Sequence, residues 1–148
     1  MSIKFEIKRF NELSLLELYQ LLQLRSNVFV VEQDCVYPDL DGKDEKAIHL
    51  LGMFEGKVAA YCRIFEPGYY FDNASIGRVV IGAQYRDRKW GHILMQEAIA
   101  AILEAYNTTS VTISAQLYLK KFYEGHGFVQ VGEEYLEDGI PHIRMERG

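Results

Sequence analysis

The spacing of apolar residues near the start of the chain predicts a β-strand followed by a helix. Residues 3–7 alternate between apolar and charged side chains, a period of two that is typical of a half-buried strand. Ser14 and Glu17 then have the spacing of a capping box, which marks a helix N-terminus. Apolar residues of helical period continue from Leu15 to about Phe29.

The rest of the chain alternates between strand-like and helix-like patterns. A hairpin is predicted where two apolar runs flank a Glu55-Gly56 turn. Loops are predicted at 34–46 and 66–75, where proline, glycine and polar residues interrupt the apolar pattern. The remaining predictions are strands at 49–54, 58–65, 76–81, 111–115, 129–136 and 142–147, helices at 91–106 and about 119–126, and a turn at 137–141.

This order of elements indicates a mixed α+β fold with helices on both faces of one sheet. A run of antiparallel strands leads into βαβ units, which excludes a doubly wound parallel sheet. The strand–helix–strand step through 76–115 requires a right-handed crossover between parallel strands. We expect a central, mostly antiparallel sheet of about seven strands in a single domain spanning residues 1–148.

Composition narrows the class of protein. The 148 residues are 49% hydrophobic and 25% charged, as in an ordinary globular domain. The formal net charge of −5 gives no basic surface for nucleic acid, and no apolar stretch is long enough to span a membrane. Two cysteines, Cys35 and Cys62, and the absence of a readable signal peptide favour a reducing compartment, so we expect a cytoplasmic protein.

The acidic segment 34–46 contains five Asp or Glu residues. The Asp39-x-Asp41 spacing is like that of a calcium loop. However, Lys43 and Asp44 stand where such a loop needs a ligand and a glycine, so no metal site is predicted. The segment is interpreted as a solvated loop, with a field that attracts cationic amines as the weaker alternative.

The most informative stretch lies between the strand 76–81 and the helix that starts near Gly91. Three cations, Arg86, Arg88 and Lys89, fall within four positions directly before a helix N-terminus. Unpaired N–H groups and the helix dipole make such a terminus suitable for phosphate. The stretch is neither a P-loop nor a Rossmann fingerprint. From these residues alone, a pyrophosphate site and a solvated basic turn remain equally open.

Two motifs in this order resemble those of the GNAT acyltransferase superfamily. Residues 86–91 resemble motif A, [RQ]-x-x-G-x-[GA], with Arg86 and Gly91 matching and Lys89 replacing the usual glycine. Residues 122–128 resemble motif B, with Phe122-Tyr123 and Gly127-Phe128 at the correct spacing. The segments 24–33, 37–42 and 137–142 resemble the ElaA-like branch of this family in particular.

The resemblance implies a GNAT fold that binds acetyl-CoA where the fourth and fifth strands diverge. It also implies direct transfer of the acetyl group to an amine. Tyr123 matches the family's usual general acid, although a core aromatic residue is the alternative from the helical pattern alone. The residues that the resemblance places around the donor are Val79, Val80 and Ile81 along the pantetheine, Arg86, Asp87, Arg88, Lys89, Trp90, Gly91 and His92 around the pyrophosphate, and Gln116.

The acceptor side is less defined by sequence. A general base is expected among Glu32, His49 and His142, with Asp41 as a weaker candidate. Arg25, Phe29 and Glu32 are expected to contact the acceptor, although an ion pair between Arg25 and Glu32 is an equal alternative.

The sequence leaves two other functions and one assembly open. An acyl-homoserine-lactone-synthase-like acyltransferase and a non-catalytic CoA-binding module are the alternatives to an acetyltransferase. A homodimer, the commonest symmetric assembly, is an open prediction.

Overall fold

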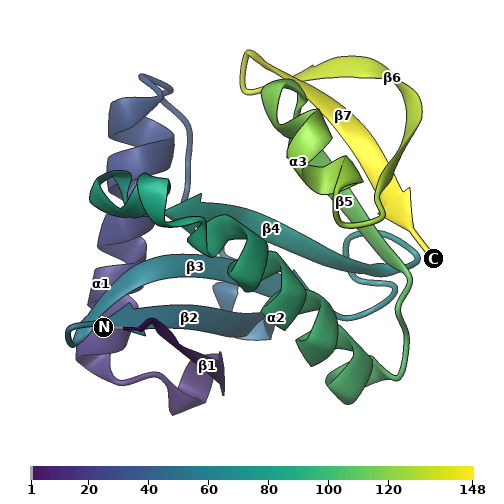
Figure 1. Ribbon diagram of the computed structural model, residues 1–148. Coiled ribbons are helices and arrows are strands. Elements are labelled where there is room, and N and C mark those ends of the chain that lie inside the picture. Colours follow the sequence, from purple (N-terminus) through teal and green to yellow (C-terminus); the bar gives the residue numbers. More distant parts are fainter. Residues whose placement is uncertain (1) are drawn as a thin grey trace.

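The computed structural model describes residues 2–148, which form one seven-stranded sheet with the strand order β1-β2-β3-β4-β5-β7-β6 (Figure 1). All neighbouring pairs are antiparallel except β4 and β5, which are parallel as predicted. The strands are β1 Lys4–Arg9, β2 Ile48–Phe54, β3 Lys57–Phe65, β4 Ala74–Ile81, β5 Val111–Gln116, β6 Val129–Glu137 and β7 Ile140–Arg147. The α-helices are α1 Leu15–Arg25, α2 Trp90–Tyr106 and α3 Lys120–Glu124.

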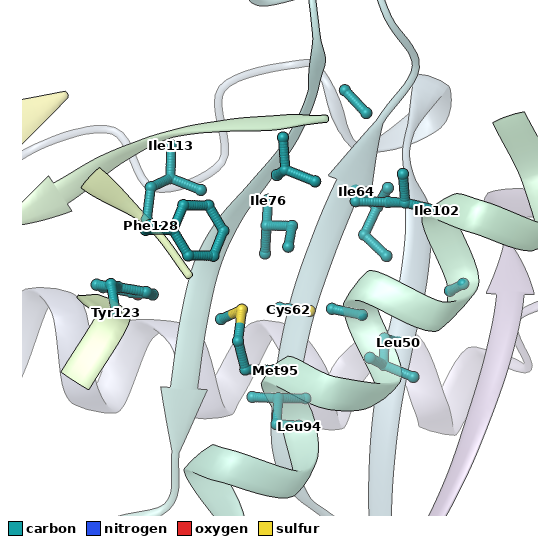
Figure 2. Packing of buried hydrophobic residues seen from close by; sticks show 14 of the residues in the cluster. Leu50, Cys62, Ile64, Ile76, Leu94, Met95, Ile102, Ile113, Tyr123 and Phe128 are labelled. Carbon is teal, nitrogen blue, oxygen red and sulfur yellow. The ribbon is translucent and has the colours of Figure 1, made fainter. Parts of the chain in front are cut away.

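Helices α1 and α2 cover opposite faces of the sheet, and strand alternation explains how. Successive side chains of a strand point to opposite faces, so neighbouring apolar residues enter different cores. On β2, Leu50 packs in the core under α2, whereas Leu51 packs in the core under α1. Figure 2 shows the α2 core, in which Met95 lies close to Cys62 of β3. Cys62 is fully buried there and packs as a small apolar side chain.

Helix α1 begins at the predicted capping box. The Ser14 hydroxyl accepts a hydrogen bond from the Glu17 backbone N–H at 3.0 Å, and the Glu17 carboxylate accepts from the Ser14 N–H at 2.8 Å. The predicted helix continues to Glu32, but its last segment, Ser26–Glu32, is π-helical. Such wide turns occur frequently at functional sites, and this one ends beside the cavity described below.

The β4–β5 pair is the only parallel pair of the sheet, and it is very short. Only Ala74 and Ser75 of β4 pair with β5, and the two strands then diverge (Figure 1). The remainder of β4, from Ile76 to Ile81, therefore has an unpaired edge on this side. This divergence was expected from the family resemblance, and it opens the sheet in its middle.

The acidic segment 34–46 is only in part the solvated loop that the sequence suggested, because many of its residues are exposed but three of its aspartates are buried or half-buried. Asp39 is 4% exposed, and its carboxylate contacts Arg25 Nε at 3.0 Å and Arg78 Nε at 2.8 Å. Asp44 lies between two buried guanidinium groups, 2.8 Å from Arg25 and 3.0 Å from Arg63. The segment is held onto the sheet because each of these arginines needs a carboxylate partner away from water.

Asp41 completes this network through a two-point contact with Arg63, in which one N–O distance is 2.9 Å. Three arginines and three aspartates neutralise one another, so the aspartates provide no field for attracting a cationic substrate. The alternative of an Arg25–Glu32 ion pair is wrong as well, because Arg25 is completely buried against Asp39 and Asp44.

Candidate active site

A cavity of about 750 Å³ occupies the space where β4 and β5 diverge. This volume lies within the range of about 300–1,000 Å³ that is usual for small-molecule sites. Its walls come from the π-helical segment, β4, the end of β5, α3 and the β6–β7 hairpin. Of the predicted site residues, it is lined by Phe29, Glu32, Val79, Val80, Ile81, Arg86, Gly91, Gln116, Tyr123 and His142.

The unpaired edge of β4 forms one long wall of the cavity. A β-bulge opposite Cys62, with Arg78 at a φ of +51°, shifts the register between β3 and β4 at this point. Bulges bend a strand and increase its twist, and this one lies just beyond the point where β4 stops pairing with β5. Beyond the bulge, the Ile81 carbonyl accepts a hydrogen bond from Arg86 Nε at 3.3 Å, and the unpaired edge around Val79 remains available to an extended ligand that adds to the sheet like a strand.

The basic loop adopts a turn that explains part of motif A. Lys89 stands at the N-cap of α2 with a φ of +60°, in the left-handed region that glycine occupies at little cost. The lysine keeps the turn that a glycine would make, so the replacement changes the side chain without changing this local backbone. Gly91 follows in the first turn of α2, where a Cβ atom would lie 3.4 Å from the Phe122 ring.

The cations of this loop have different surroundings. The Arg86 guanidinium lines the cavity and forms a two-point ion pair with the Glu32 carboxylate, one N–O distance being 2.8 Å. The Arg88 guanidinium instead lies over the Trp90 ring at 5.2 Å, within an aromatic cluster that includes Phe54 and Tyr85. Trp90 is 7% exposed and packs in that cluster, outside the cavity.

His92 pairs with a residue of α3. Its Nδ1 lies 2.9 Å from Nε2 of His126, and both rings pack against Phe122. Like Asp87, Arg88, Lys89 and Trp90, His92 does not line the cavity itself. These five residues lie in the turn between β4 and α2 or in the first turn of α2.

The segment 32–35 contributes to the cavity wall and contacts three separate elements. Glu32 pairs with Arg86 of the basic loop. The side-chain amides of Gln33 and Gln116 exchange two hydrogen bonds of 3.2 Å, which connects the π-helical segment to the end of β5. The Cys35 thiol lies 3.4 Å from the Asp138 carbonyl oxygen in the β6–β7 turn. Residues 32–35 therefore connect the basic loop and the end of β5 to the C-terminal hairpin.

Tyr123 lies in the cavity wall opposite β4. It is 5% exposed, and its ring packs edge-on against Phe122 and Phe128. Figure 2 shows Tyr123 and Phe128 on the same side of the core. Burial raises the pKa of the phenol above its usual value, so Tyr123 keeps its proton at neutral pH. The ring therefore packs in the core and also lines the cavity, and the role of general acid stays a prediction.

The three candidate bases are in very different environments. His49 is fully buried outside the cavity, where Nε2 donates to the Asp44 carbonyl at 2.8 Å and Nδ1 accepts from the Tyr61 hydroxyl at 2.6 Å. Both ring nitrogens are used, so the prediction of His49 as a base is wrong. Glu32 lines the cavity, but the guanidinium of Arg86 lowers the pKa of its carboxyl, which makes it a weaker base.

His142 remains as a basic group that faces the cavity. Its Nδ1 donates a hydrogen bond to the Ile140 carbonyl at 2.7 Å, which leaves the lone pair on Nε2. Nε2 lies 3.4 Å from a carboxylate oxygen of Glu137. Nε2, the ring nitrogen that can accept a proton, is therefore the one that lies beside the Glu137 carboxylate.

Arg25 does not contact the cavity, because its guanidinium is completely buried in the ion-pair network. Its prediction as an acceptor contact is wrong, and the reason is that its three aspartate contacts arise from residues distant in sequence. Phe29 does line the cavity. Asp41, the weaker base candidate, is paired with Arg63, which helps to hold the pKa of its carboxyl far below the usual value despite its burial.

Several cavity residues were missed from the sequence. Ser114, Tyr135 and Glu137 gather around His142, and they could have been found from strand alternation once the β5–β7–β6 register was known. Other wall residues that were missed include aromatic and arginine side chains from β3, β4 and two loops, among them Tyr37, Arg63, Phe65, Tyr70, Phe71 and Arg78.

Comparisons with known proteins agree with this fold. Residues 26–147 match the family model of the acetyltransferase (GNAT) domain. The chain is 40% identical to Protein ElaA of Escherichia coli strain K12 over 147 residues, covering 98% of this chain and 96% of that protein. A diverged central strand pair beside a cavity defines an acyl-CoA N-acyltransferase fold, and the chain belongs to the GNAT acetyltransferase family.

Solved structures show the same relationship. An acyl-CoA N-acyltransferase from Pseudomonas aeruginosa has a TM-score of 0.94 at 43% identity, covering 99% of this chain and 100% of that one. The crystal structure of E. coli ElaA has a TM-score of 0.90 at 40% identity, with the same coverage. The CoA-dependent acyl-homoserine lactone synthase BjaI shares the fold, with a TM-score of 0.79 at 17% identity over 98% of this chain and 82% of that one. Among residues 2–148, none of the helices is long and apolar enough to cross a membrane.

Proposed function

We propose that this acetyltransferase moves the acetyl group of acetyl-CoA directly to a primary amine, with Tyr123 as general acid and His142 as general base. The observation that carries the proposal is that one cavity joins the free edge of β4 to both side chains. A thioester held along β4 would thus have a proton donor and a proton acceptor within the same enclosed space.

The donor side follows from the backbone of β4 and the basic loop. The pantetheine arm would pair with the strand edge around Val79–Ile81, in the manner of an added strand. The pyrophosphate would lie near Arg86 and the N-terminus of α2, where backbone N–H groups are unpaired. Free N–H groups on the β4 edge are also suited to stabilise the oxyanion of the tetrahedral intermediate.

The proposed reaction moves two protons. The ammonium form of the acceptor loses one proton to Nε2 of His142, and the neutral amine then attacks the thioester carbon. The C–N bond forms and the C–S bond breaks. Tyr123 donates its proton to the departing thiolate and recovers one from the attacking nitrogen through solvent. The high pKa that burial gives to Tyr123 keeps it in the acid form that this step requires.

The acid role of Tyr123 is tested by Tyr123→Phe. Positioned acids contribute about 10²–10⁴-fold, so kcat for CoA release should fall by about that factor while acetyl-CoA affinity stays unchanged. Steady-state kinetics and calorimetric titration with acetyl-CoA give the two quantities. Tyr19→Phe on α1, an exposed position outside the cavity, is the matched control. Full kcat in the Tyr123→Phe variant, or an equal loss of donor affinity, would refute the assignment.

The donor is tested by thermal unfolding. Acetyl-CoA at about 100 times its Kd should stabilise the fold by about 2.7 kcal/mol. For a chain of this length, that equals roughly 5–10 °C in Tm. The Arg86→Ala variant should need more acetyl-CoA for the same shift, and more so at high salt. An equal shift with ATP would mean that the cavity selects a nucleotide phosphate rather than a CoA thioester.

A further inference from the structure

The β6–β7 hairpin presents a polar cluster to the cavity. Its turn residues, Asp138 and Gly139, have φ values of +51° and +77°, the conformation of a two-residue type I′ turn. This turn sets Glu137 opposite Ile140 and Tyr135 opposite His142. Because side chains alternate along each strand, the four residues lie on one face of the hairpin, and all of them line the cavity.

Hydrogen bonds connect this cluster to β5. The Ser114 hydroxyl donates to a Glu137 carboxylate oxygen at 3.2 Å and is also bonded to the Tyr135 hydroxyl. The other Glu137 oxygen lies 3.4 Å from Nε2 of His142. In the imidazole tautomer in which Nδ1 donates to the Ile140 carbonyl, Nε2 and this oxygen are two hydrogen-bond acceptors that face each other. A ligand group with several N–H donors, placed close to both atoms, would donate a hydrogen bond to each of these two acceptors.

The charges of the cavity wall point to the same kind of ligand. Each arginine that lines the cavity already has a carboxylate partner: Arg63 with Asp41 and Asp44, Arg78 with Asp39, and Arg86 with Glu32. Within residues 2–148, Glu137 and Asp138 have no lysine or arginine in ion-pair distance. The nearby Arg144 lies over the Phe71 ring and pairs with Glu146. The uncompensated charge of the cavity wall is therefore negative and lies at the hairpin.

We propose that Glu137 binds the ammonium group of a small primary amine that carries no carboxylate beside its amino group. The inference rests on the proposed function and names the acceptor class of the same site. The ammonium donates to Glu137 and to His142, and His142 Nε2 then removes one proton, which leaves the neutral nucleophile. The resulting imidazolium is stabilised by the same Glu137 carboxylate.

A carboxylate next to the amine would be rejected for an electrostatic reason. An α-carboxylate would lie close to Glu137 and Asp138, and like charges at short range are unfavourable. The arginines of the wall offer it no compensation because the Asp39, Asp41, Asp44 and Glu32 carboxylates already occupy them. Alkylamines and aralkylamines fit this wall, whereas free α-amino acids do not.

The test compares amines with amino acids that differ only in the carboxylate. Phenethylamine is paired with phenylalanine, and isoamylamine with leucine, and each is titrated calorimetrically into the protein saturated with CoA. The amine of each pair should bind about tenfold more tightly or better, the size of a charged hydrogen bond. Equal or tighter binding of the amino acids would overturn the proposal, and so would binding of a lysine-containing peptide in preference to both amines.

The role of Glu137 is tested by Glu137→Gln, with Glu134→Gln as the control. Glu134 is an exposed carboxylate on the same strand that does not line the cavity. Glu137→Gln should weaken amine binding about tenfold and reduce the preference for the amine, with CoA binding unchanged. Glu134→Gln should change neither quantity. Equal amine binding in wild type and Glu137→Gln would refute the inference.

The two proposals fail in distinguishable ways. If the wild-type protein does not bind CoA, the proposed function is contradicted. The acceptor assignment is then tested separately, by comparing the amines and amino acids on the protein without CoA. Retained CoA binding with no preference for amines would contradict only the acceptor assignment.

Discussion

Two groups of carboxylates in this protein have the same chemistry and opposite surroundings. Asp39, Asp41 and Asp44 are held by arginine side chains that are largely removed from water. Glu137 and Asp138, at the tip of the β6–β7 hairpin, face the cavity, and within residues 2–148 no lysine or arginine lies in ion-pair distance of either carboxylate. The first group is structural because its charge is compensated. The second is available to a ligand because its charge is not.

The difference shows that partners, rather than residue type, decide what a carboxylate does. A buried ion needs a counter-ion, and once it has one it exerts little field on a ligand. Glu32 is an intermediate case, since it lines the cavity and is paired with Arg86 at the surface, with both side chains more than two-fifths exposed. Substitutions in the buried aspartate network, at the β6–β7 hairpin and at Glu32 should therefore differ in their effects on stability and on ligand binding.

The largest effect is expected for Asp44→Ala, which leaves Arg25 and Arg63 with one partner fewer. Removing one member of a buried ion pair costs about 3–5 kcal/mol. The free energy of unfolding, measured by denaturant titration, should fall by about this amount. Glu45→Ala, at the exposed neighbouring position, is the control and should be nearly neutral. A neutral Asp44→Ala would mean that the network does not stabilise the fold.

The same network predicts a pH dependence. Hydrogen bonds and charges from the arginines outweigh burial and lower the pKa of the Asp41 and Asp44 carboxyls. A lowered folded-state pKa gives stability that is present above the ordinary aspartate pKa of about 3.9 and is lost as the pH falls below it. Unfolding free energy measured from pH 6 to pH 2 should therefore decline below about pH 4. The decline should be shallower in Asp44→Ala, and identical slopes would contradict the assignment.

The smallest effect on stability is expected for Glu32→Gln. An exposed ion pair contributes about 0–1 kcal/mol, so the unfolding free energy should change little. Arg86, freed from its partner, should bind the donor's phosphates better, raising acetyl-CoA affinity by up to about fivefold. An unchanged acetyl-CoA affinity would mean that Arg86 does not bind the phosphates of the donor. A large fall in kcat with the Glu32→Gln variant would instead restore Glu32 as the base.

Much of the fold was predictable from local patterns. Period-two alternation, the Ser14–Glu17 capping box and the helical period of 91–106 all correspond to elements of the structure. The π-helical end of the first helix was missed, because its apolar spacing differs little from that of an α-helix. The short parallel contact of β4 with β5 was expected only through the family resemblance, since no local pattern encodes where two strands diverge.

The site was predictable where its groups are contiguous in sequence. The β4 edge and the Phe122-Tyr123 motif are each contiguous in sequence and line the cavity, whereas only Arg86 and Gly91 of the predicted basic-loop residues do. His49 and Arg25 were misassigned because their partners, Asp44, Tyr61 and Asp39, come from other elements. A histidine or arginine in a sequence has the same chemistry whether it is buried or faces a ligand.

The sequence by itself determined the secondary structure, the order of the strands along the chain and the family, because these depend on periodicity and on motifs of fixed spacing. Only the tertiary structure decided which charges are compensated. The ion pairs of Arg25, Arg63 and Arg78 join residues between 14 and 39 positions apart, and the Glu137–His142 pair depends on a hairpin register set by the Asp138-Gly139 turn. Electrostatic energy depends on distance and solvent exposure, and both are properties of the folded chain.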